Sequence, residues 1–145
     1  MVSIEPVSFD ELPALAALYE ELIDSKTNLD KMAESFRWMQ SNPDYILLGA
    51  KDDNGLLVGS LLGVVCHDII GECRPFMVID NVIVKSDCRG LGIGRQLMHH
   101  IEEIVRARDC HYIMFVSAFN RKEAHKFYES VGYSLDAVRG FKKYL

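Results

Sequence analysis

Long apolar runs are absent from this sequence of 145 residues, and their absence limits where the protein can work. No stretch approaches the roughly 18 apolar residues that a membrane-spanning helix needs. The first residues, MVSIEPVSFDEL, lack the basic region and apolar core that mark a secretory signal peptide. The sequence therefore predicts a cytoplasmic protein without a membrane partner.

Cysteine is sparse, and its spacing excludes the common metal motifs. The four cysteines are Cys66, Cys73, Cys88 and Cys110, and they form no CxxC pair and no cluster with histidine. We therefore expect free thiols in a reducing compartment and no metal site.

Basic residues are not in excess, since the formal net charge is −5. Binding a nucleic acid requires a basic surface that neutralises phosphates, so no nucleic-acid partner is expected. Residues 1–40 hold eight acidic and three basic side chains, whereas the remaining residues hold thirteen of each. This acidic segment either attracts a cationic ligand or forms a solvated helix face, and the sequence leaves both interpretations open.

Regular periodicity is present along the whole chain and predicts one domain over residues 1–145. A capping box at Ser8 and Glu11 begins a first helix after an extended segment. Further helices are predicted at 29–40, 92–108 and 120–132, the last with Asn120 as its N-cap. Strands are predicted at 45–51, 56–66, 75–85 and 111–117, with one or two more in 133–145 and a hairpin turn at Asn54-Gly55. This order predicts an α/β domain with a mixed sheet and helices on both faces.

The stretch CRGLGIGRQLMHH, residues 88–100, places three glycines at the start of an apolar-periodic helix. A helix N-terminus presents unpaired N–H groups and a partial positive charge, and glycine lets an anion approach them closely. A diphosphate ligand suits this loop. The glycine spacing fits neither the G-x-G-x-x-G dinucleotide motif nor the P-loop, which needs G-K-S or G-K-T.

Two motifs resemble those of the GNAT family of acyl-CoA-dependent N-acyltransferases. The run Arg89-Gly90-Leu91-Gly92-Ile93-Gly94 matches the family's cofactor loop, (Q/R)-x-x-G-x-(G/A). Asn120, followed by FYESVGY at 127–133, matches the second motif. The resemblance implies a GNAT fold, in which a central, mostly antiparallel sheet of six to seven strands is splayed at the cofactor site and carries about four helices.

The resemblance also implies acetyl-CoA as the cofactor, with its diphosphate at the glycine loop and its pantetheine arm along the end of the strand at 75–85. The partner strand on the far side of the arm would be 113–117. The implied cofactor-binding residues are Val82, Ile83, Val84, Arg89, Gly90, Leu91, Gly92, Ile93, Gly94, Arg95, Asn120 and Tyr128.

The expected reaction is direct attack of an amine on the thioester. The resemblance implies that Tyr128 protonates the departing thiolate, although a core tyrosine is the alternative. One common position of the family's base falls here on Val78, which cannot accept a proton. Asp80 lies two residues further, on the same face of the strand, and is the candidate base. Its alternative role is that of a structural carboxylate.

The expected acceptor is a primary amine of a small, cationic molecule, with Glu21, Asp24 and Asp80 as substrate-binding residues. A protein lysine or N-terminus is an alternative acceptor, and a non-catalytic acyl-CoA sensor is an alternative function. The C-terminal FKKYL has strand character and could support a homodimer, but Lys142 and Lys143 could equally protect an exposed sheet edge.

Overall fold

A computed structural model describes residues 1–145, and the chain divides into two compact units, 1–114 and 115–145. The first unit contains five strands, three α-helices and two short 3-10 helices, at Phe9–Glu11 and Ser86–Cys88. The strands are β1 (Ser3–Pro6), β2 (Tyr45–Lys51), β3 (Leu57–Cys66), β4 (Phe76–Val84) and β5 (Ile113–Met114).

The five strands form one sheet in the order β1-β2-β3-β4-β5. The first three pairings are antiparallel, and β5 alone runs parallel to its neighbour, β4. The turn between β2 and β3 closes with a hydrogen bond from the Asp52 N–H to the Leu56 carbonyl, at 2.9 Å, and Gly55 has a φ of 78°. The hairpin predicted at Asn54-Gly55 is therefore confirmed.

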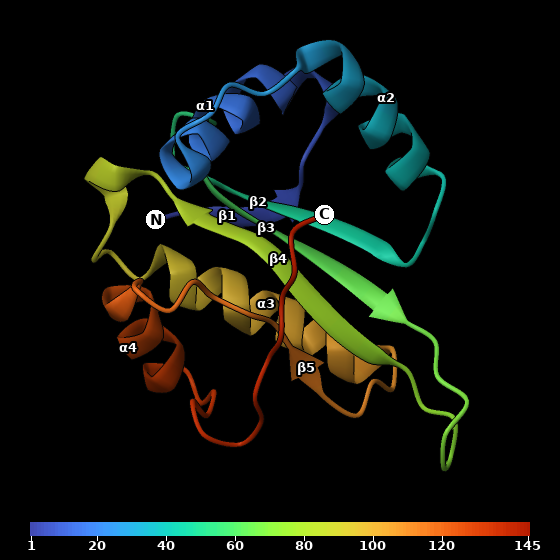
Figure 1. The fold of residues 1–145 in the computed structure, drawn as a ribbon. Helices are drawn as coiled ribbons and strands as arrows, with labels where there is room; N and C mark the ends of the chain where they lie inside the picture. The colour runs from blue at the N-terminus through green and yellow to red at the C-terminus, as the bar shows by residue number, and fades with distance from the viewer. The chain divides into compact units, whose positions relative to one another are not determined.

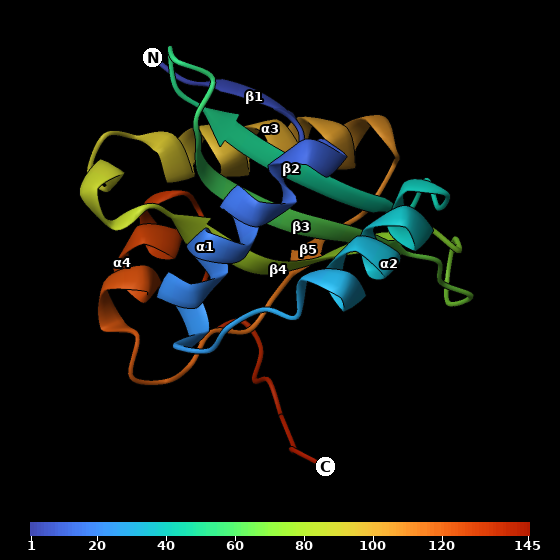
Figure 2. The same ribbon diagram turned by 90° about the horizontal axis from the view of Figure 1, so that it is seen from above.

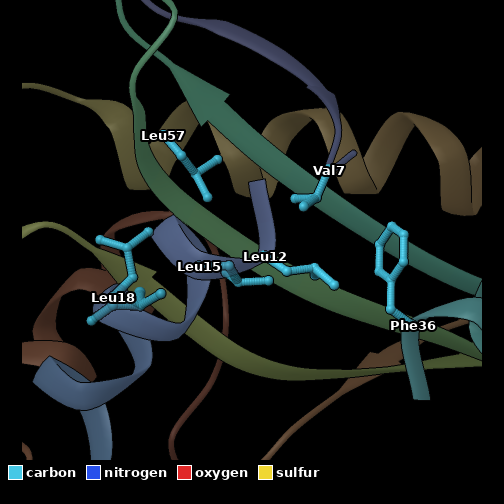
Figure 3. Packing of buried hydrophobic residues seen from close by; sticks show 7 residues of the cluster. Val7, Leu12, Leu15, Leu18, Phe36 and Leu57 are labelled. Carbon is cyan, nitrogen blue, oxygen red and sulfur yellow. The ribbon is translucent and has the colours of Figure 1, made fainter. Parts of the chain in front are cut away.

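Helices cover both faces of this sheet (Figure 1). One face carries α1 (Leu12–Ile23) and α2 (Leu29–Gln40), and the other carries α3 (Ile93–Ala107). Between the sheet and α1 and α2 lies a cluster that includes Val7, Leu15 and Phe36 (Figure 3). Towards α3, a Cβ atom at Gly63 would come within 3.0 Å of Ile101, so glycine there allows the helix to approach β3 closely.

The second unit contains α4 (Lys122–Ser130) and no strand. Within it, the Phe115 ring lies 4.5 Å from the Tyr128 ring and 4.9 Å from the Tyr133 ring, measured between centroids. The last residues are open to solvent, with the Val138 and Phe141 side chains 80% and 89% exposed.

Local sequence patterns predicted several elements correctly. The capping box at Ser8 and Glu11 is present, and α2 spans residues 29–40 as predicted. The mixed, mostly antiparallel sheet and four α-helices are confirmed.

Three predictions were wrong. The sheet has five strands rather than six or seven, because residues 133–145 form no strand and the side chains of residues 134–145 remain exposed instead of packing on the sheet. The strand predicted at 111–117 is limited to Ile113–Met114. Arg121 rather than Asn120 is the N-cap of α4, and no side chain caps that helix.

Candidate active site

The glycine loop joins the 3-10 helix Ser86–Cys88 to α3. Gly90 and Gly92 have φ values of 78° and 82°, in the left-handed region that other residues enter only at a cost. A Cβ atom added to either would meet no atom within 4 Å. These glycines are therefore required by backbone conformation, and the space over the loop is open.

The helix α3 begins directly at this loop, as the sequence predicted to within one residue. Its first turn closes with a hydrogen bond from the Gln96 N–H to the Gly92 carbonyl, at 3.1 Å. An α-helix has no carbonyl within the helix for its first N–H groups, so the start of α3 can offer such groups to a ligand at this loop. The helix dipole adds positive potential at this end.

Charged side chains on and just before the glycine loop are engaged with nearby groups. The Arg89 Nε donates to the Val84 carbonyl at 3.0 Å, which ties the loop to the end of β4. The Lys85 ammonium pairs with the Asp87 carboxylate at 2.8 Å. The hydrogen bond to this carboxylate raises the pKa of Lys85. Lys85, just before the 3-10 helix, is thus paired with Asp87, and Arg89 of the loop is directed at the backbone of β4.

Glu21, predicted as a substrate-binding residue, is hydrogen-bonded to the segment that precedes the glycine loop. Its Oε1 accepts hydrogen bonds from the Ser86 hydroxyl at 2.7 Å and from the Ser86 N–H at 3.3 Å. This carboxylate joins α1 to the segment four residues before Gly90. Asp24 is exposed and ends α1 in the left-handed conformation, with a φ of 51°, which aspartate tolerates better than most residues.

The β4 strand changes register beside the candidate base. Ser60 pairs with Ile83 and Leu62 pairs with Asp80, so β4 has one extra residue between these pairs. Asn81 takes the left-handed conformation there, with a φ of 52°. Pairing with β5 ends at Val78, whereas β4 continues to Val84. The strand end predicted to bind the pantetheine arm, Val82 to Val84, therefore lies beyond the last β5 pair.

Asp80 is exposed, and its Oδ1 accepts a hydrogen bond from the Asn81 N–H at 2.9 Å. The negative charge of this carboxylate acts on the phenol of Tyr19, a residue of α1. Burial is the main cause that raises the pKa of Tyr19 to about 12, and the Asp80 charge adds to it, while a hydrogen bond with Ser60 opposes it. The geometry therefore brings Asp80, Tyr19 and Ser60 to one region of the sheet.

Tyr128, the candidate acid, lies on α4 and is only 7% exposed. Burial raises the pKa of Tyr128, so its phenol keeps its proton through the neutral range. Asn120 is exposed just before α4. The same unit contains a group that the sequence did not single out: the Ser117 hydroxyl is buried without a hydrogen-bond partner.

Two other serines were also missed, Ser60 and Ser86. Ser60 is fully buried and donates to the Leu48 carbonyl at 2.7 Å. A single polar residue inside the apolar run LVGSLLG was the signal that could have identified it. Ser86 gave no such signal, because its partner Glu21 is 65 residues away in the sequence.

Two cysteines lie in surroundings that raise the pKa of their thiols. Hydrogen bonding to Asp87 raises the pKa of the Cys88 thiol, and burial raises the pKa of Cys110. Both thiols therefore favour the protonated, less nucleophilic form. No group of three or more histidine, cysteine or acidic side chains is arranged to hold a metal ion.

None of the helices is both long enough and apolar enough to cross a membrane.

Comparisons with known proteins identify the family to which this chain belongs. The model of the acetyltransferase (GNAT) family matches residues 15–133. An L-methionine sulfoximine/L-methionine sulfone acetyltransferase of Pseudomonas aeruginosa is 27% identical over 124 residues, covering 77% of this chain and 68% of that protein.

Solved structures show the same fold over almost the whole chain. A chain from Agrobacterium tumefaciens described as an acetyltransferase has a TM-score of 0.91 and 26% identity, with 99% of each chain covered. The glucosamine-6-phosphate N-acetyltransferase of Arabidopsis thaliana has a TM-score of 0.87 at 16% identity, again with 99% of each chain covered. From the family match across most of its length, we conclude that this chain belongs to the GNAT family of acetyltransferases and is an acyltransferase.

Proposed function

We propose that this protein is an acetyl-CoA-dependent N-acetyltransferase that acts on a primary amine of a small molecule. The observation that carries the proposal is the left-handed pair Gly90 and Gly92 at the start of α3, next to a β4 strand that continues beyond its β5 partner. Members of the GNAT family generally use acetyl-CoA, and the Pseudomonas relative acetylates a small molecule that carries an amine.

The residues present fit the diphosphate of coenzyme A. The amides at the start of α3 can donate to phosphate oxygens, and the open space above Gly90 and Gly92 admits the anion. The extended end of β4, Val82 to Val84, fits the amide-bearing pantetheine arm, because main-chain groups of an extended strand can pair with it.

Bound acetyl-CoA would supply an acetyl thioester, whose C–S bond breaks as the amine nitrogen forms the new C–N bond, while the amine releases a proton and the thiolate takes one. Asp80 would accept the proton of the incoming ammonium, directly or through a water, since it is exposed on β4. Tyr128 would donate the proton for the thiolate, because burial keeps its phenol protonated.

The proposal is tested by mixing the purified protein with acetyl-CoA and a panel of primary amines and measuring thiol release. Calorimetric titration with coenzyme A measures cofactor binding separately. We expect both a binding heat and amine-dependent thiol release. Binding without release for any amine would favour the alternative sensor function, and the absence of a binding heat would overturn the proposal.

The role of Asp80 has its own test in a substitution that keeps the shape of the side chain. Asp80→Asn removes the proton acceptor, so we expect kcat/KM to fall about 10²-fold to 10⁴-fold. Steady-state kinetics with the best amine of the panel measure this, and calorimetry checks that coenzyme A binding is kept. An unchanged kcat/KM would assign Asp80 a structural role.

A further inference from the structure

The side chains around Asp80 restrict the class of amine that can serve as the acetyl acceptor. Leu62 pairs with Asp80, Val64 pairs with Val78, and Val78 pairs with Met114. Directly paired residues on neighbouring strands point to the same side of a sheet, and alternate residues do so along a strand. Leu62, Val64, Val78, Asp80 and Met114 therefore share one side, which we name the Asp80 face.

This face is directed away from α3. The side chains of Met77 and Ile79, which alternate with Val78 and Asp80 along β4, are only 0% and 3% exposed. A Cβ atom at Gly63, on that buried side, would meet Ile101 of α3. The Asp80 face therefore lies on the side of α1 and α2. Those two helices diverge above it. In Figure 2, a stretch of β3 and β4 is visible between α1 and α2.

The Asp80 face is partly open to solvent and almost wholly apolar. Leu62, Val64 and Val78 are half-buried, and Met114 is 44% exposed. Tyr45, paired with Val64, extends the face toward α2, where Trp38 contacts its ring at 5.1 Å between centroids. The surface beside the candidate base thus consists of aliphatic and aromatic side chains.

Asp80 is the one charged residue of this face. The carboxylate of Glu21 is hydrogen-bonded to Ser86, and Asp24 lies exposed at the end of α1. These two residues, which were expected to attract a cationic amine, are therefore not part of the Asp80 face. A second ammonium group on a ligand would lie against apolar side chains without a partner, which is costly. A carboxylate or phosphate on the ligand would have no basic residue on this face and would be repelled by Asp80.

We propose that the acceptor is an amine with a single positive charge on an apolar body, such as an arylalkylamine, whose ammonium group faces Asp80 and whose apolar body lies on Leu62, Val64, Val78 and Met114. This inference rests on the proposed function and specifies its substrate class. It narrows the expected acceptor, a primary amine of a small cationic molecule, to an amine with one positive charge.

Turnover with a matched panel tests the substrate class. We expect kcat/KM for 2-phenylethylamine to exceed the values for spermidine, methionine sulfone and glucosamine 6-phosphate by roughly tenfold or more, because burial of the ring adds binding free energy that the others lack. A preference for any of these three would overturn the inference and leave the proposed function intact. Thiol release with none of the amines would overturn the proposed function.

Binding can be measured without turnover, because Trp38 is the only tryptophan and lies at the edge of the face. Titration of the protein with 2-phenylethylamine in the presence of coenzyme A should change its tryptophan fluorescence at a lower concentration than spermidine does. Equal or weaker binding of 2-phenylethylamine would contradict the inference whatever the turnover result.

Charge substitution on the face provides a switch of specificity. Met114→Glu adds a second carboxylate, and we expect the ratio of spermidine to 2-phenylethylamine turnover to rise about tenfold relative to the neutral, similarly sized Met114→Gln. Leu56→Glu, in the exposed β2–β3 turn, adds the same charge elsewhere and should leave the ratio unchanged. A ratio that rises equally in Met114→Glu and Leu56→Glu would show that net charge, not this face, selects the acceptor.

Discussion

At the scale of single residues, Tyr128 is the side chain whose surroundings best match its proposed role. Its ring packs against Phe115 and Phe127, with centroids 4.5 and 5.3 Å away. This packing removes the phenol from water and raises its pKa, so the hydroxyl remains a proton donor in the neutral range.

Tyr128→Phe deletes only that hydroxyl and keeps the ring. We expect kcat to fall by about 10²-fold to 10⁴-fold with little change in the affinity for coenzyme A, because the proton donor is lost while the packing persists. Steady-state kinetics and calorimetry check the two quantities. Tyr133→Phe deletes a hydroxyl from the other ring packed on Phe115 and serves as the matched control. A parallel loss of affinity and turnover in Tyr128→Phe would mean that Tyr128 is structural.

Glu21 is the second residue whose role the contacts define, since it holds Ser86 ahead of the glycine loop. Glu21→Ala should weaken coenzyme A binding about threefold to tenfold by freeing this segment, with a smaller effect on kcat. Glu21→Gln keeps an acceptor oxygen and should restore the affinity.

A double-mutant cycle with Ser86→Ala isolates this contact. Glu21→Ala and Ser86→Ala should weaken coenzyme A binding by less in combination than the product of their single effects. Calorimetric dissociation constants for the four proteins measure the coupling. Strictly multiplicative effects would show that the contact does not position the loop.

At the scale of elements, the junction of the glycine loop with α3 matters most. Gly92 combines a left-handed φ with open space, so a side chain there would meet backbone strain rather than a clash within the protein. A β-branched residue is the least suited to this conformation.

Gly92→Val should therefore abolish detectable coenzyme A binding while the fold survives, since the strained loop and its new side chain obstruct the anion. Gly71→Val is the matched control, because Gly71 also has a positive φ, 58°, and no atom within 4 Å of its added Cβ. Calorimetry should show binding lost only in Gly92→Val, with far-UV circular dichroism unchanged in both. Normal binding by Gly92→Val would contradict the assignment of the diphosphate to this loop.

At the scale of the first compact unit, Asp44 connects elements that are distant in sequence. Its carboxylate lies 2.9 Å from the His67 Nε2 after β3 and 2.6 Å from the Arg108 guanidinium after α3. The His67 hydrogen bond is the main cause that holds the pKa of Asp44 below its ordinary value, and Arg108 adds to it. Because the pKa is lower in the folded chain, this contribution to stability is present at neutral pH and is lost as the pH falls through the folded value.

Asp44→Asn should lower Tm by about 2–6 °C at pH 7. The difference from the parent protein should shrink as the pH falls below about 4, because Asp44 of the unfolded parent chain then binds a proton while the lower pKa in the folded chain resists it. Thermal unfolding followed by circular dichroism at several pH values measures this. Asp53→Asn alters an exposed ion pair with the N-terminus and should change Tm by no more than about 1 °C. A difference that stays constant between pH 7 and pH 3 would rule out the ionised form of Asp44 as the cause.

The sequence by itself determined the features that neighbouring residues set. These are the capping box at Ser8, the span of α2, the hairpin at Gly55 and the glycines that open α3, because hydrogen bonds within a few residues and the conformational range of glycine fix them. The family motifs, which are also local, identified the enzyme class.

Only the tertiary structure decided which distant groups meet. It paired Glu21 with Ser86, brought Tyr19 to Asp80 and Ser60, and gathered Val64, Val78 and Met114 on one face. It also left residues 133–145 without a strand, although their composition suits one. The physical reason is that strand register and helix placement bring residues together across dozens of positions, and periodicity within one segment does not contain that information.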